Sequence, residues 1–164
     1  MKQEANDVKN PKRVVIERIF DAPIELVWRA WTVPENLMLW WGPRDFTAPA
    51  AKIDLKVGGR YHFCMQAPDG QKLWSTGTYR EIVPNERLVW TDSFSDEQGN
   101  VVSAQEYGMP ADIPIEMKVT VILEALGSKT RMTLIHEGLP EGELHDATVI
   151  GWNESIDKLA KSLK

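Results

Sequence analysis

The chain has 164 residues, of which 43% are hydrophobic and 26% are charged. This is an ordinary globular composition, and the length favours a single domain with a substantial core rather than a disordered or fibrous chain. The 19 Lys and Arg residues against 24 Asp and Glu residues give a net charge of −5 at pH 7. The acidic balance argues against broad binding to nucleic acid or to anionic membranes, which require positive surface.

The N-terminal segment is polar and mixed in charge, and it lacks the apolar run of a secretory signal. We expect a flexible arm over residues 1–11, followed by one domain over residues 12–164. No apolar run in the chain approaches the roughly 18 residues of a membrane span. Cys64 is the only cysteine, so an internal disulfide and a cysteine zinc cluster are both excluded. Together these features predict a cytoplasmic protein.

The first predicted elements are a strand and two short helices. Residues 14–20 alternate in the manner of a strand, and Pro23 then marks a helix start. The apolar residues that follow occupy the i, i+3, i+4 and i+7 positions of one helical face: Ile24, Val27, Trp28 and Trp31. Pro34 is expected to end this helix, and a second helical stretch is expected over residues 36–40.

A series of antiparallel strands is expected next, because the apolar pattern changes to a period of two and turn residues separate the runs. The expected strands cover residues 47–55, 60–66, 73–83, 87–94, 115–125 and 129–137. Residues 95–114 interrupt this pattern with polar residues, glycines and prolines. We expect a lid-like loop there rather than an interdomain linker, since neither half of the chain has a complete core.

A long amphipathic helix is predicted from about Glu143 to Leu163. Gly151 lies in its middle and costs about 1 kcal/mol relative to Ala, so it should have a local reason, such as a close approach or room for another group. A curved sheet whose apolar face wraps this helix satisfies the whole pattern. Such a sheet and a single helix need not fill the space between them, so we expect a cavity.

Five segments resemble a known protein group and together span nearly the whole chain after the arm: residues 16–23, 27–32, 39–43, 54–61 and 151–159. They are similar to the first strand and helix, the W-W-G-P segment, the glycine hairpin and the closing helix of proteins like the C-terminal domain of the activator of heat-shock protein 90 ATPase. This group belongs to the START and birch-pollen-allergen-like helix-grip superfamily. The resemblance implies an α+β helix-grip fold, with a curved antiparallel sheet of about seven strands around a long C-terminal helix and two short helices after the first strand.

The 7 tryptophans are either core filler or the walls of an aromatic pocket. On the pocket hypothesis, we expect these side chains to line the cavity between sheet and C-terminal helix: Trp74, Trp90, Met117, Val121, His136, Trp152 and Ile156. Trp40 and Trp41 are expected to form a packed corner rather than a patch for a partner. We expect no cofactor or metal, because the His and carboxylate spacing over residues 136–146 matches no standard metal motif.

His136 is the most informative titratable residue, because it shares a strand face with apolar Met132 and Leu134. It is a hydrogen-bonded core histidine, a ligand contact, or an acid–base group that works with Glu106 or Glu137. Cys64 has no identifiable base and is expected to pack structurally. Glu106 and Tyr107 would touch a ligand only if the long loop acts as a lid.

The preferred functional hypothesis is a module, monomeric or homodimeric, that binds a small hydrophobic or aromatic molecule. One alternative, which rests on the resemblance, is a domain that interacts with the heat-shock protein 90 chaperone. The other is a cyclase-like or hydrolase-like enzyme that uses the same cavity. The family resemblance does not decide between them, because its members include carriers, a chaperone activator and cyclase-like enzymes.

Overall fold

The computed structural model describes residues 13–140 and 142–164. The expected arm over residues 1–11 lies outside this part of the chain. The described elements are β1 (Arg13–Phe20), α2 (Ile24–Thr32), α3 (Pro34–Leu37), β2 (Thr47–Ile53), β3 (Arg60–Gln66), β4 (Lys72–Val83), β5 (Arg87–Ser95), the 3-10 turn η1 (Ala104–Tyr107), β6 (Met117–Leu126), β7 (Lys129–Glu137) and α4 (Glu143–Ser162).

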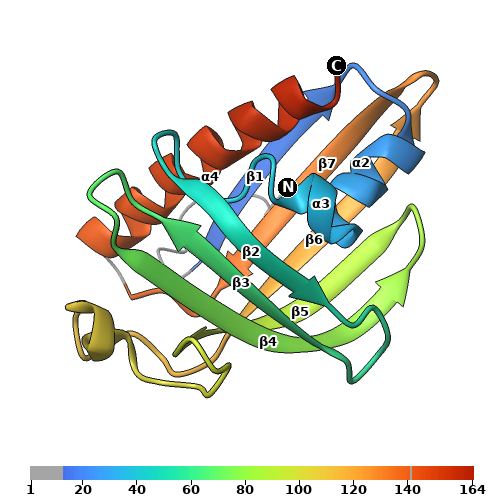
Figure 1. Cartoon of the computed structure of the whole chain (residues 1–164). Helices are drawn as coiled ribbons and strands as arrows, with labels where there is room; N and C mark the ends of the chain where they lie inside the picture. Colours follow the sequence, from blue (N-terminus) through green and yellow to red (C-terminus); the bar gives the residue numbers. More distant parts are fainter. Residues whose placement is uncertain (1–12, 141) are drawn as a thin grey trace, which may run out of the picture.

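The strands form one antiparallel sheet in the order β1-β7-β6-β5-β4-β3-β2. The sheet is strongly curved, and α4 runs along its concave side, while α2 and α3 cover the other end of the same side (Figure 1). Strands from β2 to β7 follow one another as neighbours because short turns connect most of them. The expected α+β helix-grip architecture with seven strands is therefore confirmed.

The chain closes on itself through β1, which pairs with the last strand, β7, over its whole length. This pairing places the N-terminal strand beside α4. Arg18 of β1 donates hydrogen bonds to Asp157 at 2.8 Å and to Asn153 at 3.1 Å, both on α4. These contacts fix the direction of α4 across the sheet.

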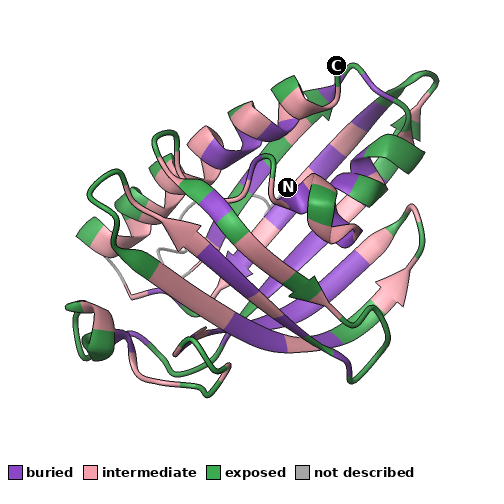
Figure 2. Cartoon of the chain, in the orientation of Figure 1, coloured by how far each residue is buried: buried purple, intermediate pink, exposed green. Residues whose placement is uncertain are grey.

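The core lies on the concave face, and buried residues alternate with less buried ones along strands such as β7 (Figure 2). On β6, Met117, Val119, Val121 and Leu123 are all at most 7% exposed. Ile156 and Leu159 of α4 have no exposed surface. Burying each such side chain contributes about 1.5–3 kcal/mol, so the packing of α4 against the sheet is the main stabilising contact of the helix.

Three expected elements have wrong boundaries. The strand expected over residues 47–55 ends at Ile53. The strand expected from residue 115 begins at Met117, because Ile115 is 54% exposed and the register with β5 ends at the Asp92–Met117 pair. The helix expected over residues 36–40 is Pro34–Leu37. Pro34 therefore ends one helix and begins the next. At the first position of a helix the backbone N–H that proline lacks would have no partner within the helix, so proline is tolerated there.

No helix within residues 13–140 and 142–164 combines the length and apolar character that crossing a bilayer requires.

Candidate ligand-binding site

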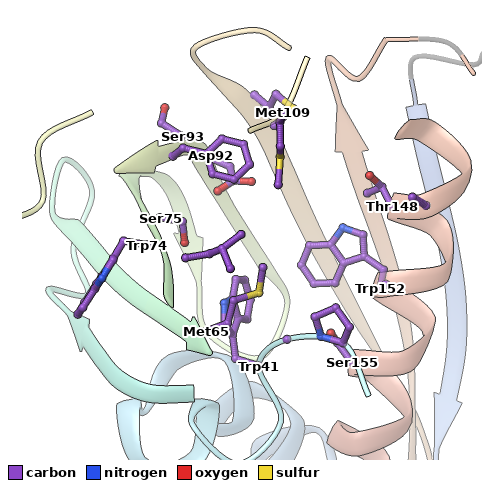
Figure 3. A pocket seen from close by; sticks show the side chains of 17 residues that line it. Trp41, Met65, Trp74, Ser75, Asp92, Ser93, Met109, Thr148, Trp152 and Ser155 are labelled. Carbon is purple, nitrogen blue, oxygen red and sulfur yellow. The ribbon is translucent and has the colours of Figure 1, made fainter. Parts of the chain in front are cut away.

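A cavity of about 300 Å³ lies between α4 and the sheet, at the end of the molecule away from α2 (Figure 3). Its wall comes from strands β3 to β6, residues 147–155 of α4, the segment after α3 and the loop before β6. The wall is mostly apolar and includes Trp41, Met65, Leu73, Phe94, Met109 and Met117. The volume and the lining match those of sites that hold small apolar molecules.

Gly151 of α4 faces this cavity. A Cβ built on Gly151 would meet nothing nearer than Cγ of Pro43, at 3.7 Å. Glycine is therefore not forced by a close approach of the backbone, although it lowers helix propensity. The effect of Gly151 is to leave room beside the helix, which is one of the two reasons expected from its position in the sequence.

Tryptophan rings fill the opposite end of the concave face. The ring centroids of Trp31 and Trp40 are 4.6 Å apart, and those of Trp31 and Trp90 are 5.6 Å apart. Trp40 has no exposed surface and donates a hydrogen bond from Nε1 to the carbonyl oxygen of Ala30 at 3.0 Å. The small hollow that borders these rings has no room for a water molecule. The Trp40–Trp41 corner is thus packed, and the cavity lies beyond Trp41 and Trp152.

Of the seven side chains expected to line the cavity, three belong to residues at its wall: Trp74, Met117 and Trp152. The others lie outside the wall. Trp90, Val121 and Ile156 are at most 3% exposed and belong to the packed core. His136 is also buried, at 5% exposure, behind the wall.

The indole of Trp74 points away from the cavity centre, although the residue borders it (Figure 3). Trp74 pairs with Cys64 in the β3–β4 register. Its ring stacks on His62, with ring centroids 4.6 Å apart. Side chains alternate between the two faces of a strand, so the neighbouring Leu73 faces the cavity in place of the indole.

Trp152 and His136 connect α4 to the sheet beside the cavity. Nε1 of Trp152 donates a hydrogen bond to Nδ1 of His136 at 3.0 Å. Burial lowers the pKa of His136, while the negative charge of Asp92 opposes this shift. The expected inward orientation of His136 is therefore observed, and the imidazole accepts a hydrogen bond from the Trp152 side chain.

Asp92 is the ionisable residue of the cavity wall, and it was not among the side chains expected from the sequence. It extends from β5 into the cavity wall (Figure 3). The alternation along β5 puts Asp92 on the same strand face as Trp90 and Phe94. Its Oδ1 is 3.1 Å from the Tyr61 hydroxyl, and its Oδ2 is 3.9 Å from Nε2 of His136. Burial raises the pKa of this carboxyl group, against the opposing effects of His136 and of the Tyr61 hydrogen bond. The sequence contained one signal for this residue, namely a carboxylate on a strand face whose other residues, Trp90 and Phe94, are aromatic.

The other carboxylates considered as partners of His136 lie elsewhere. Glu106 is exposed in η1 and is not part of the cavity wall. Glu137 is 3.6 Å from the ammonium group of Lys118 on the neighbouring strand. The structure thus brings Asp92, rather than Glu106 or Glu137, to the cavity beside His136.

The loop between β5 and β6 closes one side of the cavity through Met109. Tyr107 anchors this loop rather than facing the cavity. Its hydroxyl donates a hydrogen bond to the carbonyl oxygen of Ser95 and accepts one from the backbone N–H of Trp74 at 3.2 Å. The ring of Tyr107 also packs against Phe94, with centroids 5.7 Å apart. The loop therefore covers the cavity edge while fixed to β4 and β5.

The described residues contain no group of three His, Cys, Asp or Glu side chains that could hold a metal ion. Glu141, which belongs to the cluster considered in the sequence, lies outside the described residues. Cys64 has no exposed surface, and burial raises its thiol pKa, which disfavours the reactive thiolate. The polar chemistry of the cavity therefore rests on Asp92 and the residues that contact it.

Comparison with known proteins gives one family. Residues 21–164 match the model of Activator of Hsp90 ATPase homolog 1-like protein. A crystal structure from Chromobacterium violaceum is similar, with 30% identity, a TM-score of 0.75 and coverage of 93% of this chain and 97% of that one. One from Nitrosomonas europaea has 26% identity, a TM-score of 0.75 and coverage of 94% and 95%.

The AHSA1 protein of Silicibacter pomeroyi is also similar, with 25% identity, a TM-score of 0.73 and coverage of 92% of this chain and 96% of that one. No curated protein matches significantly. The seven-stranded sheet gripping α4 and the match over residues 21–164 lead to the same conclusion. The chain belongs to the family of Activator of Hsp90 ATPase homolog 1-like proteins.

Proposed function

We propose that the protein binds a small, largely apolar or aromatic molecule in the cavity between α4 and the sheet. The observation that carries this proposal is the cavity of about 300 Å³ with its mostly apolar wall. Protein interiors normally close such spaces with side chains, because an empty apolar cavity costs stability. At the other end of the same concave face, tryptophan rings do fill the space.

Gly151 supports the proposal independently. A side chain at this position would improve the helix by up to about 1 kcal/mol, and the space beside it is free. A helix that served only to cover the core would gain from alanine or a larger residue here. A glycine at this wall position instead keeps space in the cavity open for a ligand.

The test compares two substitutions at Gly151, with naphthalene as an uncharged aromatic probe. Gly151→Phe adds a ring beside the cavity, whereas Gly151→Ala adds only a methyl group and is the matched control. We expect naphthalene to bind the wild type and Gly151→Ala, and to bind Gly151→Phe at least about tenfold more weakly. Isothermal titration calorimetry measures the affinities, and circular dichroism checks that both variants fold.

Two results would contradict the proposal. One is an absence of naphthalene binding to the wild type at any soluble concentration. The other is equal binding to Gly151→Phe and Gly151→Ala, which would place the probe outside the cavity. Native mass spectrometry of freshly purified protein adds a check that needs no chosen probe, since a co-purified molecule would appear as added mass.

The description of the family supports a second candidate, stimulation of the Hsp90 ATPase. The relevant measurement is the ATPase rate of the chaperone with and without this chain. Stimulation that persists in Gly151→Phe would separate a chaperone role from ligand binding. No stimulation at micromolar concentrations of the chain would remove the second candidate.

A further inference from the structure

We propose that the ligand carries a hydroxyl group, and that the hydroxyl oxygen binds between Oδ2 of Asp92 and Nε2 of His136. This inference rests on the proposed function and names the polar group that the cavity selects. The ligand class is therefore an apolar or aromatic alcohol or phenol, with its ring system against the apolar wall. Three structural observations support it.

The first observation fixes the proton on the imidazole of His136. The indole N–H of Trp152 can only donate a hydrogen bond. Since it points to Nδ1 of His136 at 3.0 Å, Nδ1 accepts and carries no proton. Burial favours the neutral imidazole by lowering its pKa. The single remaining proton must then sit on Nε2, which makes Nε2 a hydrogen-bond donor.

The second observation is that this donor has no partner. Nε2 of His136 is buried and makes no hydrogen bond within the described part of the chain. The nearest carboxylate oxygen is Oδ2 of Asp92, and 3.9 Å separates the two atoms. This distance is too long for a direct hydrogen bond, yet leaving a buried donor unsatisfied costs free energy.

The third observation concerns the carboxylate. Oδ1 of Asp92 is already 3.1 Å from the Tyr61 hydroxyl. Oδ2 makes no hydrogen bond to the described residues and belongs to a residue of the cavity wall, whose side chain is 23% exposed. The pair thus consists of one acceptor, on Asp92 in the cavity wall, and one donor, on His136 directly behind that wall, 3.9 Å apart.

Only a few polar groups satisfy both atoms at once. A hydroxyl oxygen accepts from Nε2 and donates its own hydrogen to Oδ2. A carbonyl or ether oxygen can only accept, so it leaves Oδ2 without a donor. An ammonium group can only donate, so it opposes the Nε2 proton, and a carboxylate is repelled by Asp92. The arrangement therefore favours a hydroxyl over each of these alternatives.

The stability cost of Asp92 supports a role beyond packing. The carboxyl group is held in a mostly apolar wall, where burial disfavours its charged form. An uncharged side chain would avoid this penalty. Polar groups that a fold retains at such a cost inside a cavity commonly orient a ligand.

The test compares three probes that differ in one group: naphthalene, 2-naphthol and 2-methoxynaphthalene. The methoxy compound keeps the oxygen but loses the hydrogen that would be donated to Asp92. At neutral pH we expect the wild type to bind 2-naphthol about tenfold or more tightly than 2-methoxynaphthalene, which is the usual size of a hydrogen bond to a charged acceptor. Calorimetry measures the affinities, and competition with naphthalene confirms a shared site.

Two substitutions then test the named residues. His136→Asn keeps an acceptor for Trp152 but removes the Nε2 donor, and Asp92→Asn removes the charge of the acceptor. In both we expect the preference for 2-naphthol to fall to about threefold or less, and the naphthalene affinity of each variant is measured alongside to show whether the cavity persists. Asp157→Asn is the matched control, because Asp157 is an exposed carboxylate on α4 that pairs with Arg18.

The outcomes separate this inference from the function on which it rests. If no probe binds, both proposals fail. If all three probes bind equally to the wild type, the cavity binds apolar molecules but does not select a hydroxyl, and a water molecule is sufficient for the Asp92–His136 gap. If the preference exists but survives both substitutions, Asp92 and His136 do not provide it. The wild-type comparison needs no variant and holds even if a substituted protein does not fold.

Discussion

The indole N–H of Trp152 donates a hydrogen bond to Nδ1 of His136 at 3.0 Å, which joins α4 to β7 beside the cavity. The bond has two consequences. It anchors the helix through a polar contact in addition to apolar packing, and it selects the imidazole tautomer with the proton on Nε2. The ring of Trp152 also borders the cavity and contacts Trp41, with ring centroids 5.7 Å apart.

Replacing Trp152 by Phe should remove this hydrogen bond while keeping an aromatic ring at the same place. We expect the free energy of unfolding to fall by about 1–3 kcal/mol, because Nδ1 of buried His136 loses its donor. Urea denaturation measures the change. Nitrogen-15 NMR of His136 should show a mixture of tautomers in place of one.

Trp74→Phe is the control for this substitution, because the Trp74 indole stacks on His62 away from the cavity centre. It should leave the His136 tautomer unchanged. An unaltered His136 spectrum in Trp152→Phe would contradict the assigned hydrogen bond.

The stability of the protein should depend on pH through His136. Burial lowers the pKa of this imidazole in the folded state, so below about pH 6.5 the unfolded chain binds a proton more readily. The free energy of unfolding should therefore decrease as the pH falls from about 7.5 to about 5.5. Urea denaturation at several pH values measures this slope.

His136→Asn removes the titrating group and should flatten part of the slope. His136→Gln is a second isostere and should behave alike, since neither side chain gains a proton in this range. An identical slope in the wild type and in both variants would assign the pH dependence to other residues.

Asp92→Asn should stabilise the protein at neutral pH or leave its stability unchanged. The pKa of Asp92 is raised on folding because the carboxyl group is largely shielded from solvent, so above that pKa the ionised form is penalised in the folded state. The penalty disappears as the carboxyl group becomes protonated at lower pH, and Asn avoids it at every pH. The advantage of Asn should thus be greatest at neutral pH and shrink toward about pH 4.

The measurement compares the urea concentrations at which Asp92→Asn and Asp157→Asn are half unfolded. Asp157→Asn removes an exposed ion pair, so it should change the free energy of unfolding by at most about 1 kcal/mol. A loss of more than about 1 kcal/mol in Asp92→Asn at neutral pH would mean that the Tyr61 hydrogen bond outweighs the cost of burying the charge.

Gly77→Ala should be among the most damaging small substitutions. A Cβ at Gly77 would lie 1.8 Å from the carbonyl oxygen of Thr91 and 2.8 Å from Cε2 of Tyr61. Backbone atoms of the neighbouring strand cannot move away without breaking the β4–β5 pairing, so we expect a loss of about 3 kcal/mol.

Gly151→Ala is the matched control for Gly77→Ala, because the same methyl group meets only Pro43 at 3.7 Å. It should stabilise α4 by up to about 1 kcal/mol. Thermal denaturation of both variants measures the contrast. Equal melting temperatures would show that β4 and β5 can separate locally at little cost.

The sequence was sufficient for the fold because local patterns and global packing agree. The alternation over residues 117–123 required one buried strand face, and the apolar stripe of α4 required a surface to cover. The turn glycines then left an antiparallel sheet as the simplest arrangement. The boundary at Ile115 failed because an apolar side chain at a strand end carries the same pattern whether or not it pairs with a neighbour.

The candidate site was less predictable. The structure places Trp152 at the cavity wall, because its position on the helix face leaves only the sheet side. Its contact with a ligand stays a prediction. Trp74 could not be oriented, because both faces of β3 and β4 carry aromatic side chains and periodicity does not say which face is inside. Asp92 was missed, because a single carboxylate in an apolar strand shows its environment only when the neighbouring strands are in place.

The amino-acid sequence by itself determined the order of elements, the sheet-and-helix architecture and the inward face of β7, since these depend on periodicities within short segments. The tertiary structure decided where tryptophan rings fill the concave face and where they leave a cavity. It also decided that Asp92, Tyr61, His136 and Trp152 lie together. Such contacts join residues far apart in the chain, so their distances depend on the curvature and register of the whole sheet.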